Sequence, residues 1–153
     1  MRKRETVYVS CALTGMSADY VGKIKGVIAT IQSRGHGMLH WQLVQPSWTP
    51  AQLYRHDKRC AKECTVMLVI CDERSTGMGM EAAFGIDCVG KPVLFVAHRD
   101  SVVTPMVLGA AEVEPNSQLV RYNSLAEVPD LFDAFLAEVR EIDMPLFAET
   151  IAA

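Results

Sequence analysis

The sequence predicts a single α/β domain built on a parallel β-sheet, and three observations lead to this prediction. The 153 residues suffice for one domain and leave little room for a second. Half of the residues are hydrophobic and 22% are charged, which favours a folded chain with a sizeable core. Short β-rich runs also alternate with longer segments of helical periodicity, which is the order of a parallel sheet with crossover helices.

The first half of the chain supplies two strands and two helices. A β-rich run over 6–13 predicts the first strand, and apolar residues at helical spacing predict a helix over 17–34, with a serine as its N-cap. A weaker strand is expected over 37–41. A threonine followed by proline then opens a helix over 49–63.

The second half begins with the most apolar run, over 65–71, which is typical of a central strand buried on both faces. A loop with two glycines follows over 72–79. The remaining predicted elements are a helix over 80–89, a strand over 92–97, a short helix within 98–113, a strand over 118–122 and a helix over 124–139.

This order predicts a Rossmann-like (flavodoxin-like) fold, with a five-stranded parallel sheet flanked by helices. We expect one domain over 1–153, with its core at about 6–139 and a weakly patterned C-terminal tail over 140–153. Ligands of such sheets bind outside the carboxyl ends of the strands. The segments that we expect to converge there are 12–15, 72–81 and 98–106.

The charge balance and the cysteine content indicate which binding partners and which cellular location to expect. With 15 basic and 18 acidic residues, the chain lacks the basic stripe of a nucleic-acid polymer binder. Apolar runs shorter than about 18 residues argue against a membrane partner. Five cysteines, an odd number found mostly in apolar segments, indicate reduced thiols and a cytoplasmic location. Two of them are four residues apart without a histidine pair, so we expect no metal and no cofactor.

The segment 72–81 is the most informative for function. Gly77 and Gly79 allow a tight turn, and before a helix they expose amide donors to a ligand. The third glycine of a dinucleotide fingerprint is missing. Glu81 is expected in the first turn of the following helix, where the helix dipole favours an ionised carboxylate. Such a carboxylate can attack or stabilise an oxocarbenium-like centre of a sugar. It can also be an ordinary acidic residue at a helix start with no catalytic role, and both interpretations stay open.

Asp57 and Tyr8 are the other candidates. Asp57 lies in a charged helical run that by default is a solvated face, although a second carboxyl group near Glu81 would supply the acid for a departing base. Tyr8, inside the first strand, is by default a packed aromatic residue whose hydroxyl finds one partner.

Several stretches of the chain together resemble one known family. They are 7–15, Asp57, 75–81, 90–94 and 104–110. They are similar to the nucleoside 2-deoxyribosyltransferase superfamily, and most of all to its 2'-deoxynucleoside 5'-monophosphate N-glycosidase (N-hydrolase) branch. The resemblance covers roughly residues 6–138, and 57–81 aligns with that branch without a gap.

The resemblance implies a role for each candidate. Glu81 would be the nucleophile at the anomeric carbon, Asp57 would hold and protonate the leaving base, and Tyr8 would orient the nucleophile. Ser75 and the amides of Gly77 and Gly79 would bind the 5'-phosphate or 5'-hydroxyl.

The resemblance also implies a homodimer with a shared active site, in which Thr104 reaches into the neighbour's site. We also expect Met106 at the substrate, as an apolar wall of its pocket. The first loop departs from the branch, which carries a phosphate-gripping serine and arginine where this chain has Ala12 and Thr14. We still expect Ala12, Thr14 and Gly15 at the substrate, but with a weakened preference for a 5'-monophosphate.

The expected function is therefore cleavage of the base–sugar bond of a small nucleoside or nucleoside 5'-monophosphate through a glycosyl-Glu81 intermediate. Transfer of the sugar to a second base is an alternative. A nucleotide-sensing module without turnover is another, favoured by Ala12 and Thr14. A phosphoribohydrolase of the cytokinin-activating type fits less well, because its loop carries a proline and paired glycines that are absent here.

Overall fold

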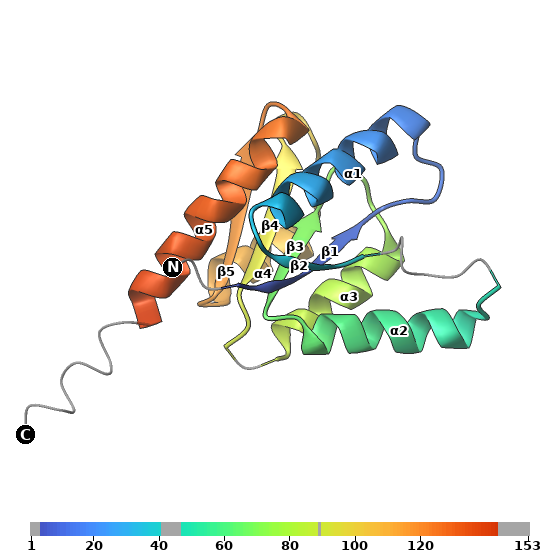
Figure 1. The fold of residues 1–153 in the computed structure, drawn as a ribbon, viewed down its shortest axis with the longest axis horizontal. Coiled ribbons are helices and arrows are strands. Elements are labelled where there is room, and N and C mark those ends of the chain that lie inside the picture. Colours follow the sequence, from blue (N-terminus) through green and yellow to red (C-terminus); the bar gives the residue numbers. More distant parts are fainter. Residues whose placement is uncertain (1–3, 41–46, 89, 144–153) are drawn as a thin grey trace, which may run out of the picture.

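Five parallel strands form one sheet in the order β2-β1-β3-β4-β5 (Figure 1). The computed structural model describes residues 4–40, 47–88 and 90–143. The strands are β1 (Thr6–Cys11), β2 (Gly37–Leu39), β3 (Val66–Ile70), β4 (Val93–His98) and β5 (Ser117–Tyr122). This is the flavodoxin-like strand order, in which the chain reverses its direction of travel between β1 and β3. The predicted fold class is confirmed.

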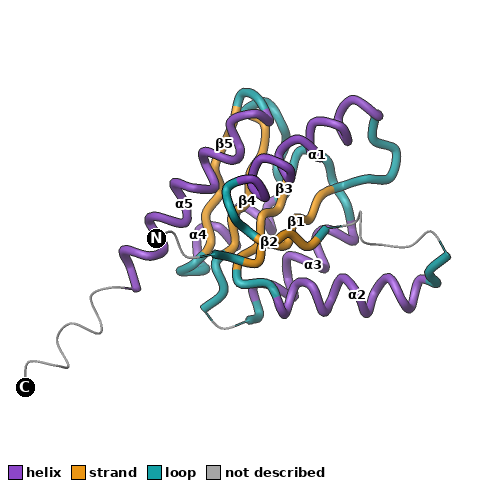
Figure 2. Tube along the Cα trace, viewed as in Figure 1, coloured by secondary structure: helices purple, strands orange, loops and turns teal. Residues whose placement is uncertain are grey.

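Helices cover both faces of the sheet. They are α1 (Ala18–Ser33), α2 (Pro50–Glu63), α3 (Thr76–Ile86), α4 (Pro105–Val113) and α5 (Val128–Asp143), with a 3-10 turn, η2 (Leu125–Glu127), before α5. α1 and α5 lie on one face, while α2 and α3 lie on the other (Figure 2). Side chains of α4 pack with the cluster beneath α2 and α3.

The alternation of side chains along β1 divides the core in two. Val7 and Val9 face the cluster beneath α1 and α5, whereas Tyr8 faces the cluster beneath α2 and α3. Every residue of β3 is buried, as the uninterrupted apolar run predicted.

Local signals explain where most helices begin. Ser17 accepts a hydrogen bond from the Tyr20 amide at the start of α1. Thr49 and Gln52 form a capping box at the start of α2, with proline at the first helical position. The third helix differs from the prediction: it begins at Thr76, so both glycines of the predicted loop lie inside α3.

The first strand and the last helix differ in length from their predicted ranges. The first strand ends at Cys11 and not at residue 13. α5 runs into the predicted tail as far as Asp143, and 144–153 lie outside the described residues, as does most of the predicted loop over 42–48. Within the described residues, no helix combines the length and the apolar character needed to cross a membrane.

Candidate active site

Glu81 is held from two positions on β1. The Ser10 hydroxyl donates a hydrogen bond to Oε2 of Glu81, and the Tyr8 hydroxyl is also hydrogen-bonded to this carboxylate. Tyr8 and Ser10 are two residues apart on one strand, so their side chains point to the same face of the sheet. Both are almost fully buried, whereas Glu81 is half-buried. A carboxylate on α3 is thereby fixed against the central sheet.

The pKa of Glu81 is raised to about 7, because burial and, to a smaller extent, the nearby charge of Asp57 outweigh the lowering effect of the Ser10 and Tyr8 hydroxyls. The sequence led us to expect Glu81 in the first turn of its helix, with its carboxylate kept ionised by the helix dipole, and the structure corrects this expectation. Since α3 begins at Thr76, Glu81 is its sixth residue and lies in the second turn, where the helix dipole acts weakly. The environment of Glu81 is set by burial and its hydroxyl donors.

Asp57 lies on α2, the helix that packs beside α3. Its Oδ1 atom is 3.1 Å from Nδ1 of His56, and its side chain is 20% exposed. His56 is nearly buried and packs against the ring of Trp48, with ring centroids 5.0 Å apart. The charge of Asp57 raises the pKa values of both Glu81 and Tyr8, although burial is the larger cause in each case. The structure therefore brings Tyr8, Asp57 and Glu81 close enough for their charges to interact, and the roles expected of them stay predictions.

Ser75 is the N-cap of α3, and this changes what the two glycines can do. The Met78 amide donates to the Ser75 hydroxyl at 3.3 Å, and the Gly79 amide donates to the Ser75 carbonyl at 3.1 Å. Gly79 therefore uses its amide within the helix, contrary to the expected role in ligand binding. Gly77 lies in the first turn, where backbone amides have no intrahelical partner, so its amide remains suited to an anion or hydroxyl.

Four of the predicted binding residues, Ser75, Gly79, Thr104 and Met106, line one cavity. Thr104 and Met106 line this cavity of about 400 Å³ between α3 and α4, together with Arg74 and Ser75, and none of Tyr8, Asp57 or Glu81 lines it. Within one chain, Thr104 and Met106 therefore line a cavity that the carboxylate pair does not line.

The first loop follows β1 at the carboxyl edge of the sheet. Ala12 is buried, whereas Thr14 and Gly15 are exposed. Gly15 has a φ of 78°, a left-handed conformation that a residue with a side chain adopts at a cost. No charged side chain occupies the two positions that carry serine and arginine in the related branch.

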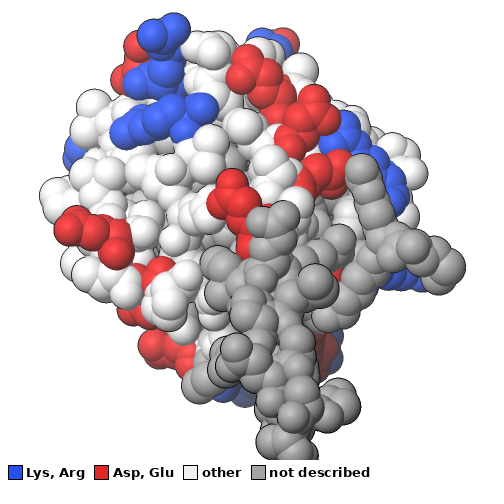
Figure 3. Space-filling view, turned by 90° about the vertical axis from the view of Figure 1, so that its left-hand side faces the viewer, with Lys and Arg blue, Asp and Glu red and all other residues white. Residues whose placement is uncertain are grey.

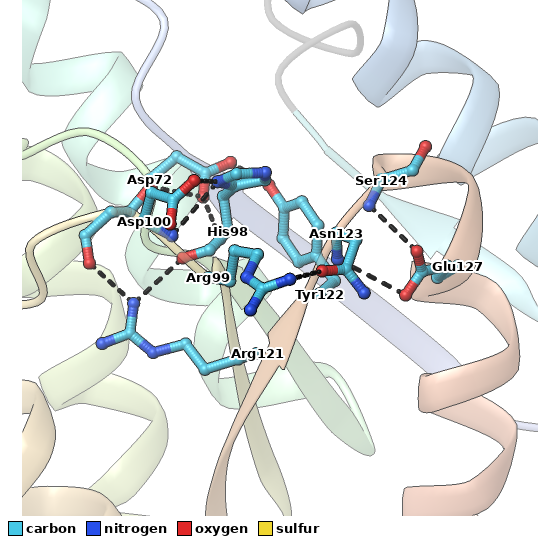
Figure 4. Close-up of polar contacts among 10 residues, drawn as sticks. Asp72, His98, Arg99, Asp100, Arg121, Tyr122, Asn123, Ser124 and Glu127 are labelled. Carbon is cyan, nitrogen blue, oxygen red and sulfur yellow. Dashed lines mark hydrogen bonds and ion pairs between the residues drawn. The ribbon is translucent and has the colours of Figure 1, made fainter.

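Asp72, a residue that the sequence did not single out, joins the ends of three strands (Figure 4). Its carboxylate accepts hydrogen bonds from the His98 amide at 2.6 Å, from the Ser101 hydroxyl at 3.2 Å and from the hydroxyls of Tyr122 and Tyr20. These donors come from β4, the loop after it, β5 and α1. Asp72 therefore anchors the loop that leads to the N-terminus of α3.

Sequence reasoning also missed Ser10 and His56. Ser10 had a usable signal, because it lies two residues after Tyr8 on a predicted strand and must share its face. His56 had none, since its contact with Asp57 joins neighbouring residues in a helical run that looked solvated.

The described residues show neither a continuous basic surface on the face drawn in Figure 3 nor a cluster of metal ligands. On the face shown in Figure 3, basic side chains are separated by acidic and uncharged ones and form no continuous stripe. Among the described residues, no group of three or more His, Cys, Asp or Glu side chains is placed to hold a metal ion.

The strand order defines a flavodoxin-like α/β protein, and its candidate site holds a fixed carboxylate, Glu81, whose pKa is raised in part by the charge of a second carboxyl group, Asp57. No protein-family model matches the chain. A protein of Thermofilum pendens that bears the provisional name 2'-deoxynucleoside 5'-phosphate N-hydrolase 1 is 24% identical over 136 residues, which are 85% of this chain and 94% of that protein.

Two solved structures share the fold. The CMP N-glycosidase BcmB of Clostridium botulinum aligns with a TM-score of 0.67 at 16% identity, over 84% of this chain and 98% of that one. A 2-deoxyribosyltransferase of Bacillus psychrosaccharolyticus aligns with a TM-score of 0.62 at 15% identity, over 85% and 95% of the two chains. These comparisons confirm the predicted resemblance to the nucleoside 2-deoxyribosyltransferase superfamily and its N-hydrolase branch. By their names, these three proteins are an N-hydrolase, an N-glycosidase and a 2-deoxyribosyltransferase.

Proposed function

We propose that this chain is an N-glycosidase that cleaves the base–sugar bond of a nucleoside or nucleoside 5'-monophosphate. The observation that carries the proposal is the position of Glu81, a carboxylate held by the hydroxyls of Tyr8 and Ser10 beside the second carboxyl group of Asp57. The names of the Thermofilum pendens and Clostridium botulinum proteins support the same bond as the target.

In the proposed reaction, a carboxylate oxygen of Glu81 attacks the anomeric carbon. The bond to the base breaks and its electron pair leaves with the base, which takes a proton from Asp57. The product of this step is an ester between the sugar and Glu81. Water then attacks the same carbon, gives its proton to Asp57 and frees Glu81. Tyr8 keeps the carboxylate in place throughout.

The 5' end of the substrate is assigned to the start of α3. The unpartnered first-turn amides, Gly77 among them, suit a hydroxyl or a phosphate oxygen, with Ser75 beside them. Ala12, Thr14 and Gly15 would border the sugar from the first loop.

We further propose a homodimer that completes the site. Thr104 is the N-cap residue of α4 but makes no side-chain capping bond, so its hydroxyl is available to a partner. Apolar side chains are exposed just before α4 and at both of its ends, with Val102 69%, Met106 84% and Val113 71% exposed. Burying this surface against a second copy would bring Thr104 and Met106 to the neighbour's carboxylate pair. The cytoplasmic location expected from the cysteines remains part of the proposal.

Transfer of the sugar to a second base is the other candidate activity, and the name of the Bacillus psychrosaccharolyticus protein favours it. One experiment separates the candidates. A panel of ribonucleosides, deoxyribonucleosides and their 5'-monophosphates is incubated with the protein, with and without an added free base, and released bases and new nucleosides are measured by chromatography.

Release of base without an acceptor supports hydrolysis, and a new nucleoside that forms only with the acceptor supports transfer. Binding without either product would favour the sensing module and contradict the proposal. Glu81→Gln is the matched control, because it keeps the shape and removes the charge. It is expected to bind substrate while kcat falls by at least about a thousandfold.

A further inference from the structure

We infer that Ser10 is a positioning residue that holds Oε2 of Glu81 and leaves Oε1 to attack the sugar. The inference rests on the proposed function, because it assigns Ser10 a part in the action of Glu81. Ser10 lies on β1 and Glu81 lies on α3, 71 residues further along the chain, so the contact exists only in the folded protein.

The burial of Ser10 is the first support. Ser10 is 1% exposed and lies one residue before the end of β1, where its partner across the sheet is Val69 of β3. A buried hydroxyl is costly unless it is hydrogen-bonded, and alanine would fill this place at no such cost. The bond to Glu81 accounts for a polar side chain at this point of the core.

The second support is geometric. The last torsion of a glutamate side chain is broad and two-fold, so a free carboxylate exchanges its two oxygens readily. A donor fixed on a β-strand removes this freedom, because Ser10 cannot move without distorting the sheet. Tyr8 approaches from the same strand, two residues before Ser10, so the carboxylate has two donors at fixed places.

The third support is electrostatic. Burial of Glu81 favours the neutral acid, and a hydroxyl donor favours the anion that attacks. Ser10 therefore keeps a larger fraction of Glu81 ready at neutral pH than burial alone would allow.

The test compares Ser10→Ala with Val9→Ala, a neighbour on the same strand that faces the opposite side of the sheet. Ser10→Ala removes the donor and is expected to lower kcat about ten- to a hundredfold, the range for loss of one hydrogen bond to a charged group, with KM changed less than about threefold. The acid limb of the kcat/KM profile is expected to move to higher pH. Val9→Ala is expected to lower the melting temperature and to leave the pH profile in place.

A second readout does not depend on turnover. The protein is labelled with ¹³C at its glutamate carboxyl groups, and the titration of Glu81 with pH is followed by NMR. The pH at the midpoint of this titration is expected to rise in Ser10→Ala and to stay unchanged in Val9→Ala. Ser10→Thr keeps the hydroxyl and is expected to have the wild-type titration midpoint. If Ser10→Ala does not fold, Ser10→Cys replaces it, and the same rise of the titration midpoint is expected.

The inference is wrong if Ser10→Ala has the same Glu81 titration midpoint and the same kcat as the wild type. If Glu81→Gln is inactive while Ser10→Ala is normal, only the role of Ser10 fails. If Glu81→Gln is active, the proposed function fails, whatever Ser10 does.

Discussion

Half-buried Glu81 lies near Asp57, and the two carboxyl groups come from neighbouring helices, α3 and α2. Burial first, and the charge of Asp57 second, raise the pKa of Glu81 to about 7. A carboxyl group with such a pKa is about half protonated at neutral pH. Activity that requires ionised Glu81 is therefore expected to depend strongly on pH.

The pH profile of kcat/KM is the first prediction. On a substrate whose base leaves without a proton, only the ionised state of Glu81 is required, so activity is expected to fall about tenfold for each pH unit below about 7. Asp57→Asn removes one cause of the raised pKa and is expected to move the acid limb to lower pH, measured on a substrate with an activated leaving group. A profile that stays flat down to pH 5 would show that Glu81 is ionised throughout.

Stability is expected to change with pH in the opposite sense. Burial raises the pKa of Glu81 from 4.5 to about 7, so its contribution to stability is fully present below about pH 4.5 and is lost as the pH rises through 7. Glu81→Gln removes this penalty. The variant is expected to be more stable than the wild type at pH 8, by at most about 3 kcal/mol, and equally stable near pH 4.5.

Chemical denaturation at the two pH values measures this difference. A variant that is less stable than the wild type at pH 8 would show that the charged carboxylate gains more from its donors than it loses by burial.

Asp57→Asn is expected to slow the release of poor leaving groups about 10²- to 10⁴-fold, the usual value of general acid catalysis. Substrates whose bases leave without a proton are expected to lose far less. The ratio of kcat/KM values for the two substrate types is the measurement. An equal loss on both would assign Asp57 a structural role, together with His56.

Much of the fold was predictable because its signals are local. The fully buried strand β3 is an uninterrupted apolar run, and Ser17 and Thr49 mark the starts of α1 and α2. The start of α3 was missed because Gly77 and Gly79 favour a loop by themselves. The N-cap at Ser75 begins the helix ahead of both glycines.

The site was only partly predictable, because its contacts join distant parts of the chain. The bond between Ser10 and Glu81 spans 71 residues, and the bond between Asp72 and Tyr122 spans 50. No pattern within a strand or helix encodes such a pair. The raised pKa of Glu81 is likewise a result of burial, which spacing does not reveal.

Complementation between inactive variants tests whether Thr104 acts across a dimer. Glu81→Gln and Thr104→Val are each expected to have low activity alone. If Thr104 serves the neighbour's site, a mixed dimer contains one site with both residues intact, so an equal mixture is expected to recover about one quarter of wild-type activity. The two variants are mixed, allowed to exchange subunits and assayed. No recovery despite confirmed exchange would place Thr104 outside the neighbour's site.

The preference for a 5'-phosphate is the last prediction. With Ala12 and Thr14 in place of a phosphate-gripping serine and arginine, the wild type is expected to prefer monophosphates over nucleosides only modestly, because one charged contact contributes about 1.5–3 kcal/mol, or roughly ten- to a hundredfold. Thr14→Arg is expected to raise this preference by about tenfold, and Thr14→Gln, uncharged and of intermediate length, is the control. Strong selectivity in the wild type would mean that another cation has replaced the missing one. The exposed Arg74, beside Ser75 in the cavity between α3 and α4, is then the residue to change, and Arg74→Gln should abolish that selectivity while leaving turnover of nucleosides intact.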